Sequence, residues 1–269
     1  MQKSGPKRAE SPSELMDESD NLDEKALKAL IRAAVSMNSK PRPQSKLAAL
    51  DAVFKDRQGE WWDTFYADRG KPVPFFVGSP DESLCKWVDG NMIPRGRALD
   101  LGCGNGRNAV YLARSGFTVD AVDYSGVAIE WAAQQAKEAG VDLRLHHASV
   151  FDLQLTAGSY DFIYDSGCFH HMPPHRRSPY VALVADALRP GGLFGMTCFR
   201  PEGGSGFSDD EAYERKTLGG GLGYTDAQLQ AFWSDRLKIR ELRQMEQPPA
   251  GSKLFGLSFL WALLAQREG

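Results

Sequence analysis

Hydrophobic and polar positions follow two different periods along the C-terminal three quarters of the chain. Short apolar runs typical of buried strands alternate with longer segments whose apolar residues recur every three or four positions, as in amphipathic helices. Strands are predicted over residues 97–101, 118–123, 142–148, 160–165, 192–199, 237–245 and 258–266. Helices are predicted over residues 79–90, 107–116, 125–140, 179–188 and 225–233, and around the aromatic residues that begin at 61. This alternation predicts an α/β fold, a mostly parallel seven-stranded sheet covered by helices on both faces.

The last two predicted strands depart from this pattern. No convincing helical segment separates 237–245 from 258–266. Two strands joined in this way pair as a hairpin, because a parallel crossover needs a longer connection. We therefore expect the last strand to run antiparallel to its neighbours.

The first sixty residues have a different character. Residues 1–20 are polar and charged, which predicts disorder. Residues 21–35 carry apolar positions at helical spacing, with Asn21 and Glu24 placed as a capping pair. The sequence thus predicts a helical extension and linker over 21–60, followed by one domain over 61–269. The extension helix is either a strut on that domain or a lid or dimer contact.

Composition and charge narrow the classes of partner. The formal net charge is −3 and 42% of the residues are hydrophobic, which argues against broad electrostatic binding to nucleic acid or to anionic lipid. No apolar run is long enough to span a bilayer, and the N-terminus lacks the apolar core of a secretory signal. The four cysteines are scattered and form no C-x-x-C pair, so neither a zinc site nor a disulfide framework is expected. We expect a cytoplasmic protein, monomeric or homodimeric.

The stretch "LDLGCGNGRNAVYLA", residues 99–113, places three glycines between a predicted strand and a predicted helix. In open parallel sheets, ligands bind beyond the carboxyl ends of the strands, where the winding reverses. Glycine lets a ligand approach the backbone closely, because it has no Cβ. Asp123 closes the next strand about twenty residues later, where an acid can accept hydrogen bonds from both ribose hydroxyls.

The glycine spacing distinguishes two classes of nucleotide ligand. Dinucleotide enzymes favour G-x-G-x-x-G, in which a helix N-terminus holds the pyrophosphate. Here the pattern is Gly102-x-Gly104-x-Gly106, and Arg107 stands where the third glycine of that motif would be. The loop therefore favours a ligand without phosphate, S-adenosylmethionine, over a nicotinamide or flavin nucleotide.

Residues 99–125, "LDLGCGNGRNAVYLARSGFTVDAVDYS", resemble the first two motifs of class I S-adenosylmethionine-dependent methyltransferases. More narrowly, the chain resembles the small-molecule branch that contains the tellurite-resistance and thiopurine methyltransferases. The resemblance runs from about Trp61 to the C-terminus and includes "DSGCFHHMPPHRRSPY" and "LRPGGLF". It implies a Rossmann-like fold and methyl transfer from S-adenosylmethionine to a small, hydrophobic acceptor at oxygen, nitrogen or sulfur. None of these motifs is specific for a substrate.

The resemblance also implies positions for the donor. The residues at its methionine end would be Asp100, Gly102, Gly104 and Asn105. Asp123 would hold the ribose, Tyr124 would pack on the adenine, and Phe75 and Phe76 would cover the donor. Many relatives carry an acid after the third strand, but Ser149 stands there in this chain, so Ser149 and the Val150 backbone are the expected adenine contacts.

The acceptor side is predicted around the end of the fourth strand. The resemblance places Asp165 there, facing the methyl group, and His170 and His171 follow it. Each histidine is either a structural brace or a general base for a hydroxyl, thiol or amine. Metal ligation is not expected, because no nearby carboxylate completes a ligand set. Substrate contacts are expected from Trp62, Tyr66, Phe169 and His170, although ordinary core positions are the alternative for about half of the aromatic residues.

The segment 200–224 is a long, glycine-rich connection, which predicts a substrate lid. Besides a methyltransferase, the sequence allows a nicotinamide-dependent oxidoreductase or a non-catalytic protein that binds S-adenosylmethionine.

Overall fold

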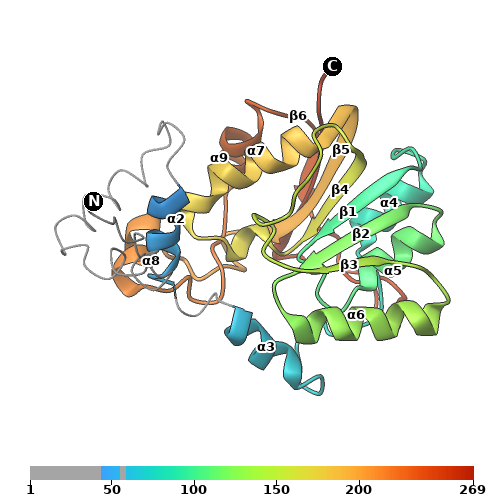
Figure 1. The fold of residues 1–269 in the computed structure, drawn as a ribbon, viewed down its shortest axis with the longest axis horizontal. Helices are drawn as coiled ribbons and strands as arrows, with labels where there is room; N and C mark the ends of the chain where they lie inside the picture. The colour runs from blue at the N-terminus through green and yellow to red at the C-terminus, as the bar shows by residue number, and fades with distance from the viewer. Residues whose placement is uncertain (1–43, 55–58) are drawn as a thin grey trace, which may run out of the picture.

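The computed structural model describes residues 44–54 and 59–269, so the predicted disorder over 1–20 and the predicted helix over 21–35 lie outside the described residues. Seven strands form one sheet in the order β3-β2-β1-β4-β5-β7-β6 (Figure 1). The strands are β1 (Arg97–Leu101), β2 (Thr118–Asp123), β3 (Arg144–His147), β4 (Tyr160–Ser166), β5 (Leu188–Phe199), β6 (Lys238–Gln244) and β7 (Leu260–Gln266). All seven predicted strands are present, and their bounds differ from the predicted ones mainly at β5, which begins directly after a helix.

The sheet is mostly parallel, as predicted. Strands β1 to β5 run parallel to one another, and β7 lies between β5 and β6 and runs antiparallel to both. The winding reverses between β1 and β4, which are adjacent in the sheet but separated by β2 and β3 along the chain. A ligand site is therefore expected at the carboxyl ends of β1 and β4.

Helices cover both faces of the sheet (Figure 1). They are α2 (Gln44–Asp51), α3 (Gly59–Ala67), α4 (Glu82–Asp89), α5 (Arg107–Arg114), α6 (Gly126–Ala139), α7 (Arg177–Ala187), α8 (Asp209–Arg215) and α9 (Asp226–Trp233), with the 3₁₀ turns η3 (Phe169–His171) and η4 (Pro174–Arg176). Helices α4, α5 and α6 lie on one face, whereas α7 and α9 lie on the other. Within the described residues, no helix has both the length and the apolar character needed to cross a membrane.

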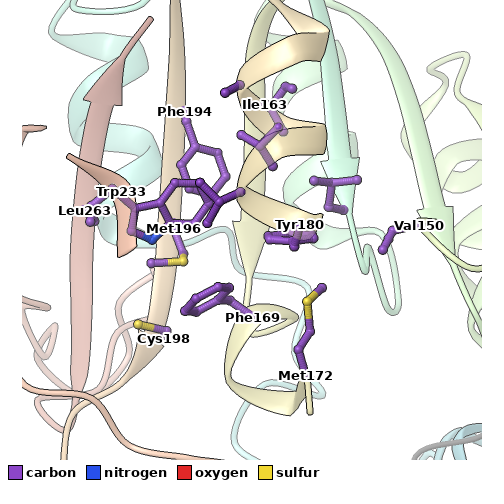
Figure 2. Packing of buried hydrophobic residues seen from close by; sticks show 14 of the residues in the cluster. Val150, Ile163, Phe169, Met172, Tyr180, Phe194, Met196, Cys198, Trp233 and Leu263 are labelled. Carbon is purple, nitrogen blue, oxygen red and sulfur yellow. The ribbon is translucent and has the colours of Figure 1, made fainter. Parts of the chain in front are cut away.

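The period of two in the strands divides the core between the two faces. In β4, Ile163 packs with α7 and α9, while its neighbours Phe162 and Tyr164 pack with α4 and α5. Figure 2 shows the first of these clusters, in which Tyr180 of α7 and Trp233 of α9 lie over the sheet. Alternate side chains of a strand point to opposite faces, so an apolar run without alternation is buried on both sides.

Two helices lie where the sequence pattern predicts none. Helix α2 begins inside the predicted linker, and its Leu50, together with Phe54 just beyond it, is buried in the main core. Helix α8 lies within the glycine-rich connection 200–224 and begins with a capping box between Ser208 and Glu211. The glycines around α8 obscure this short helix in the sequence.

Candidate functional site

The glycine loop after β1 turns through three left-handed residues. Gly102, Gly104 and Gly106 have φ values of 70°, 53° and 79°, which other residues rarely adopt. The N–H groups of Gly102 and Cys103 donate to the Val122 carbonyl at 2.9 Å each, and the Gly106 N–H donates to the Cys103 carbonyl at 2.9 Å. These amides are already used inside the protein, so the loop is not a cradle of free N–H groups for a pyrophosphate.

Neighbouring side chains approach this loop closely. A Cβ at Gly102 would lie 2.9 Å from the Cβ of Cys168, and one at Gly104 would lie 2.8 Å from the Tyr66 hydroxyl. The loop is therefore packed between the end of β4 and helix α3.

Asp123 stands at the end of β2, next to the loop. Its carboxylate accepts hydrogen bonds from the N–H groups of Gly104 at 2.8 Å and Ser125 at 2.9 Å. Burial raises its pKa to about 6 even though these N–H groups oppose the shift. Each oxygen keeps a lone pair for a further donor, such as a ribose hydroxyl.

Asp100 lies at the end of β1 with 1% of its surface exposed. Neither carboxylate oxygen has a hydrogen-bond partner among the described residues. Burial, and then the charges of nearby carboxylates, raise its pKa to about 8 although Arg107 acts in the opposite direction. A buried acid without a partner is costly in either protonation state. Asp100 is thus a position that a cationic ligand would satisfy.

A cavity of about 620 Å³ opens beside the loop at the carboxyl ends of β1, β2 and β4. Several sequence-predicted residues line this cavity: Trp62, Tyr66, Phe75, Gly102, Asp123, Tyr124, Ser149, Val150, His170 and His171. The structure thus brings together, at one edge of the sheet, residues that are more than one hundred positions apart. Ser166 and Gly167 of the β4 end lie on the same wall.

Other predicted site residues lie behind the wall. Asp100 and Gly104 are part of the glycine loop and its strand but are not on the cavity surface. The Asn105 amide donates to the Val77 carbonyl at 3.0 Å and so anchors the covering segment. Phe76 packs on Trp131 at 5.1 Å instead of on the cavity.

Asp165 differs from its expected place facing the methyl group. It is fully buried and accepts hydrogen bonds from the Cys168 N–H at 2.7 Å, the Phe169 N–H at 3.0 Å and the Tyr180 hydroxyl at 2.5 Å. Burial raises its pKa to about 7, against these hydrogen bonds. The carboxyl group holds the turn η3, which carries His170, because its lone pairs face this turn and α7.

Phe169 also differs from its expected role as a substrate contact. Its side chain is fully buried and packs against Tyr180, Tyr224 and Trp233 in the core (Figure 2). In a 3₁₀ turn, successive side chains point in different directions. As Phe169 enters the core, His170 and His171 point toward the cavity.

His170 is fixed by its surroundings. Its ring stacks on Phe199, with centroids 3.7 Å apart and planes 13° apart, and its Nδ1 accepts the Phe199 N–H at 3.2 Å. A Cβ at Gly221 would lie 3.0 Å from its Cδ2. Because Nδ1 is an acceptor, the hydrogen-bond geometry assigns the ring proton to Nε2. His170 is therefore placed as a hydrogen-bond donor.

His171 lies between His170 and helix α3. Its ring centroid is 4.9 Å from that of Trp62 and 4.4 Å from that of His170. The ring is half-buried on the cavity wall. This places the imidazole beside the aromatic cover of the site, where a bound acceptor could reach it.

Sequence reasoning missed a buried network beneath the cavity. Arg107 forms an ion pair with Asp81 at 2.6 Å and donates to the Ser166 hydroxyl at 3.0 Å. Asp81 occupies the N-cap position of α4, but its side chain makes no cap hydrogen bond and accepts instead from the Tyr164 hydroxyl at 2.6 Å. No spacing in the sequence could reveal this pairing, since the partners come from α5, the start of α4 and β4.

The N-terminal part of the chain also reaches the cavity. Asp51 and Phe54 line it, and the Asp51 carboxylate accepts from the His175 ring at 2.8 Å and from the Arg176 guanidinium. Burial opposes ionisation of Asp51, but the hydrogen bonds from these two residues outweigh it and hold its pKa below the usual value. The neighbouring Arg177 pairs in the same way with Asp209 at 2.8 Å.

Comparisons with known proteins agree with this arrangement. A family model described as a methyltransferase domain matches residues 98–192. The chain is 30% identical over 135 residues to 2-heptyl-1-hydroxyquinolin-4(1H)-one methyltransferase of Mycobacteroides abscessus, covering 48% of this chain and 59% of that protein. It is 30% identical over 173 residues to EEF1A lysine methyltransferase 4 of Mus musculus, covering 59% of this chain and 67% of that one. The chain thus spans about three fifths to two thirds of the length of these curated relatives.

A solved structure shows the same fold. 1,6-Didemethyltoxoflavin-N1-methyltransferase of Burkholderia thailandensis aligns with a TM-score of 0.56 at 21% identity, covering 86% of this chain and 93% of that one. The family match spans β1 through the start of β5, which is the part that builds the glycine loop, Asp123 and the cavity edge. The chain belongs to the class I S-adenosylmethionine-dependent methyltransferases.

Proposed function

We propose that this protein transfers a methyl group from S-adenosylmethionine to a small, uncharged and largely hydrophobic acceptor at oxygen, nitrogen or sulfur. The single observation that carries the proposal is the buried carboxylate of Asp100, which has no hydrogen-bond partner among the described residues and lies two positions before Gly102 on the cavity wall. A cationic donor in the cavity beside Gly102 fits this position, because it brings a positive charge close to a buried carboxylate that lacks a partner.

The residues around the loop fit the rest of the donor. Gly102 would contact its methionine end, with Gly104 and the Asp100 carboxylate directly behind this part of the wall, while Asn105 would keep the covering segment in place. The Asp123 carboxylate would accept from the ribose hydroxyls, as its free lone pairs allow. The adenine side would be formed by Tyr124, Ser149 and Val150, with Phe75 as the cover and Phe76 behind it.

The aromatic residues that line the cavity, and the pairing of its two arginines, support a small, uncharged acceptor. Trp61, Trp62 and Phe65 of α3 contact one another with centroids 4.7 to 5.6 Å apart, and all three line the cavity. Aromatic faces also attract a sulfonium cation. The two arginines of the wall, Arg107 and Arg176, are each paired with an aspartate, so neither is left to bind an anionic acceptor.

When bound, S-adenosylmethionine supplies a methyl group that is already activated by its sulfonium. The protein would then contribute mainly alignment and exclusion of water. We assign His171 the role of general base for a protic acceptor, and His170, through its Nε2–H, the role of orienting that acceptor by a hydrogen bond. Asp165 would act through the η3 turn as a positioning residue.

The acceptor class is also supported by similarity and by charge. Of the similar proteins, the Mycobacteroides and Burkholderia methyltransferases are named for small ring compounds. The net charge of −3 gives this chain no overall attraction to nucleic acid. We propose a small molecule as the acceptor and a monomer or homodimer as the working form.

A transfer assay tests this function. The full chain is incubated with S-adenosylmethionine labelled in the methyl group and with uncharged aromatic compounds that carry a hydroxyl, amine or thiol. We expect transfer to at least one class, and for a hydroxyl acceptor a loss of about 100-fold in turnover in His171→Asn. The control variant is His146→Asn, whose histidine lies on β3 away from the cavity wall.

The transfer assay, together with a calorimetric measurement of donor binding, distinguishes an enzyme from a non-catalytic binding protein. Donor binding without transfer to any acceptor class would favour a non-catalytic binding protein. If calorimetry detected no donor binding at all, the proposal would be wrong.

A further inference from the structure

Four buried carboxylates meet around the glycine loop. They are Asp81 before α4, Asp100 at the end of β1, Asp123 at the end of β2 and Asp165 at the end of β4, and each is at most 7% exposed. Arg107 is the cation that faces Asp100, and it is ion-paired with Asp81. The cluster is therefore richer in acid than in compensating positive charge.

Asp100 is the member of this cluster that the protein leaves unsatisfied. The other three each accept hydrogen bonds. Asp81 accepts from Tyr164, Ser166 and Asn108 and is ion-paired with Arg107. Asp123 accepts from Gly104 and Ser125, and Asp165 accepts from Cys168, Phe169 and Tyr180. Both oxygens of Asp100 lack such a partner within the described residues. A carboxylate in this setting is stabilised by a proton or by an added cation.

The surroundings of Asp100 favour the proton when no ligand is bound. The pKa of Asp100 is raised to about 8 by burial and by the negative charges of Asp81, Asp165 and Asp123. The positive charge of Arg107 offsets only part of this increase. The other titratable groups nearby are the Cys103 and Cys168 thiols and the Tyr180 phenol. Burial raises the pKa of each well above its usual value, so these three are neutral at pH 7 and supply no cation.

The two ligands of the proposed reaction differ in charge. At neutral pH the ammonium, sulfonium and carboxylate groups of S-adenosylmethionine sum to +1. S-adenosylhomocysteine, which has lost the sulfonium charge with the methyl group, sums to zero. A site with an excess of buried carboxylate therefore interacts differently with the donor and with its product.

We propose that Asp100 gives up its proton to solvent when the cationic donor binds and takes one back when the neutral product is left, so that this residue selects the donor over the product by charge. The inference rests on the proposed function, because it requires S-adenosylmethionine as the ligand. Asp100 is thus a specificity-determining residue in addition to part of the donor site.

Calorimetric titration of the full chain tests this directly. S-adenosylmethionine and S-adenosylhomocysteine are each titrated at pH 7 in buffers of different ionisation enthalpy, which reports the number of protons released. We expect about 0.9 proton released per donor bound and less than half of that for the product, given a free-protein pKa of about 8 for Asp100. Donor affinity should rise roughly tenfold between pH 6.5 and 8, a window above the pKa of about 6 of Asp123.

An isosteric variant assigns the proton to Asp100. Asp100→Asn cannot ionise, so most of the proton release should disappear, and release equal to that of the wild type would contradict the proposal. The variant's preference for donor over product should fall, whereas Asp152→Asn, an exposed carboxylate outside the cluster, should behave as the wild type.

The outcomes separate the two proposals. Donor binding without proton release, or equal release by donor and product, would overturn the role of Asp100 and leave the proposed function standing. No binding of either compound would overturn both. The wild-type measurement is decisive by itself if Asp100→Asn fails to fold.

Discussion

Two separate physical constraints, a left-handed φ and a lack of space for a Cβ, favour glycine at a position of the glycine loop. Gly104 has a left-handed φ of 53°, and a Cβ there would also press on the Tyr66 hydroxyl. Gly140, at the end of α6, has a similar φ of 66° but open space around its Cα. Both positions have a left-handed φ, but only Gly104 has a side chain close to its Cα. Comparing them therefore separates the effect of backbone strain from the effect of the contact with Tyr66.

We predict that Gly104→Ala and Gly140→Ala each lower the free energy of unfolding by about 1 kcal/mol through strain. Gly104→Ala should lower the free energy of unfolding further than Gly140→Ala, because the Tyr66 side chain must move. It should also weaken S-adenosylmethionine binding at least tenfold. Urea denaturation and calorimetry measure the two effects. Equal donor affinity in both variants would show that the contact with Tyr66 is unimportant for the site.

At the scale of elements, the turn η3 is held from below by α7. Asp165 accepts both from the Phe169 N–H of the turn and from the Tyr180 hydroxyl of α7, and these three residues are buried. The opposite side of the turn is held by the connection 200–224, since the Leu222 N–H donates to the His170 carbonyl at 2.9 Å. The predicted lid is thus packed against the histidines in this conformation.

We predict that Tyr180→Phe lowers the free energy of unfolding by about 1–3 kcal/mol, because it leaves Asp165 with one donor fewer in a buried site. It should also lower turnover more than donor affinity, since the turn carries the proposed base. Tyr111→Phe is the matched control, with a solvent-exposed hydroxyl bonded to Asp89 at 2.9 Å. Tyr111→Phe should lower the free energy of unfolding by less than about 0.5 kcal/mol. Similar losses in both variants would contradict the role given to Asp165.

For the whole molecule, the buried acids set the response of stability to pH. The pKa values of Asp100, Asp123 and Asp165 are raised to about 8, 6 and 7, mainly by burial. The folded state therefore holds more protons than the unfolded state between about pH 4 and pH 8, so stability falls as pH rises through this range.

We predict that the donor-free protein becomes less stable by at least about 1 kcal/mol between pH 5 and pH 8. Asp100→Asn should flatten this dependence throughout, and most completely from pH 7 to pH 8, where Asp123 and Asp165 contribute less because their pKa values are about 6 and 7. Denaturant unfolding at a series of pH values measures both effects. Stability that is constant or increases over this range would mean that these carboxyl groups are not protonated in the folded protein.

Much of this protein could be predicted from its sequence, since strand and helix periods are local properties of the chain. The glycine spacing and Asp123 indicate the donor site, because strand ends in a parallel sheet meet at one edge. The antiparallel last strand follows from the missing helix between 237–245 and 258–266. Helix α8 escapes prediction only because its capping box lies among glycines.

The tertiary structure alone decides which side chains face the cavity. Phe169 and His170 are adjacent in the sequence, yet the turn sends one into the core and the other to the wall. Asp81, Arg107 and Ser166 form one network from separate elements, and Asp100 is left without a partner inside it. Local pattern determines which elements form. Burial and pairing depend on contacts between segments far apart in the chain, so only the assembled fold determines the charge of the site.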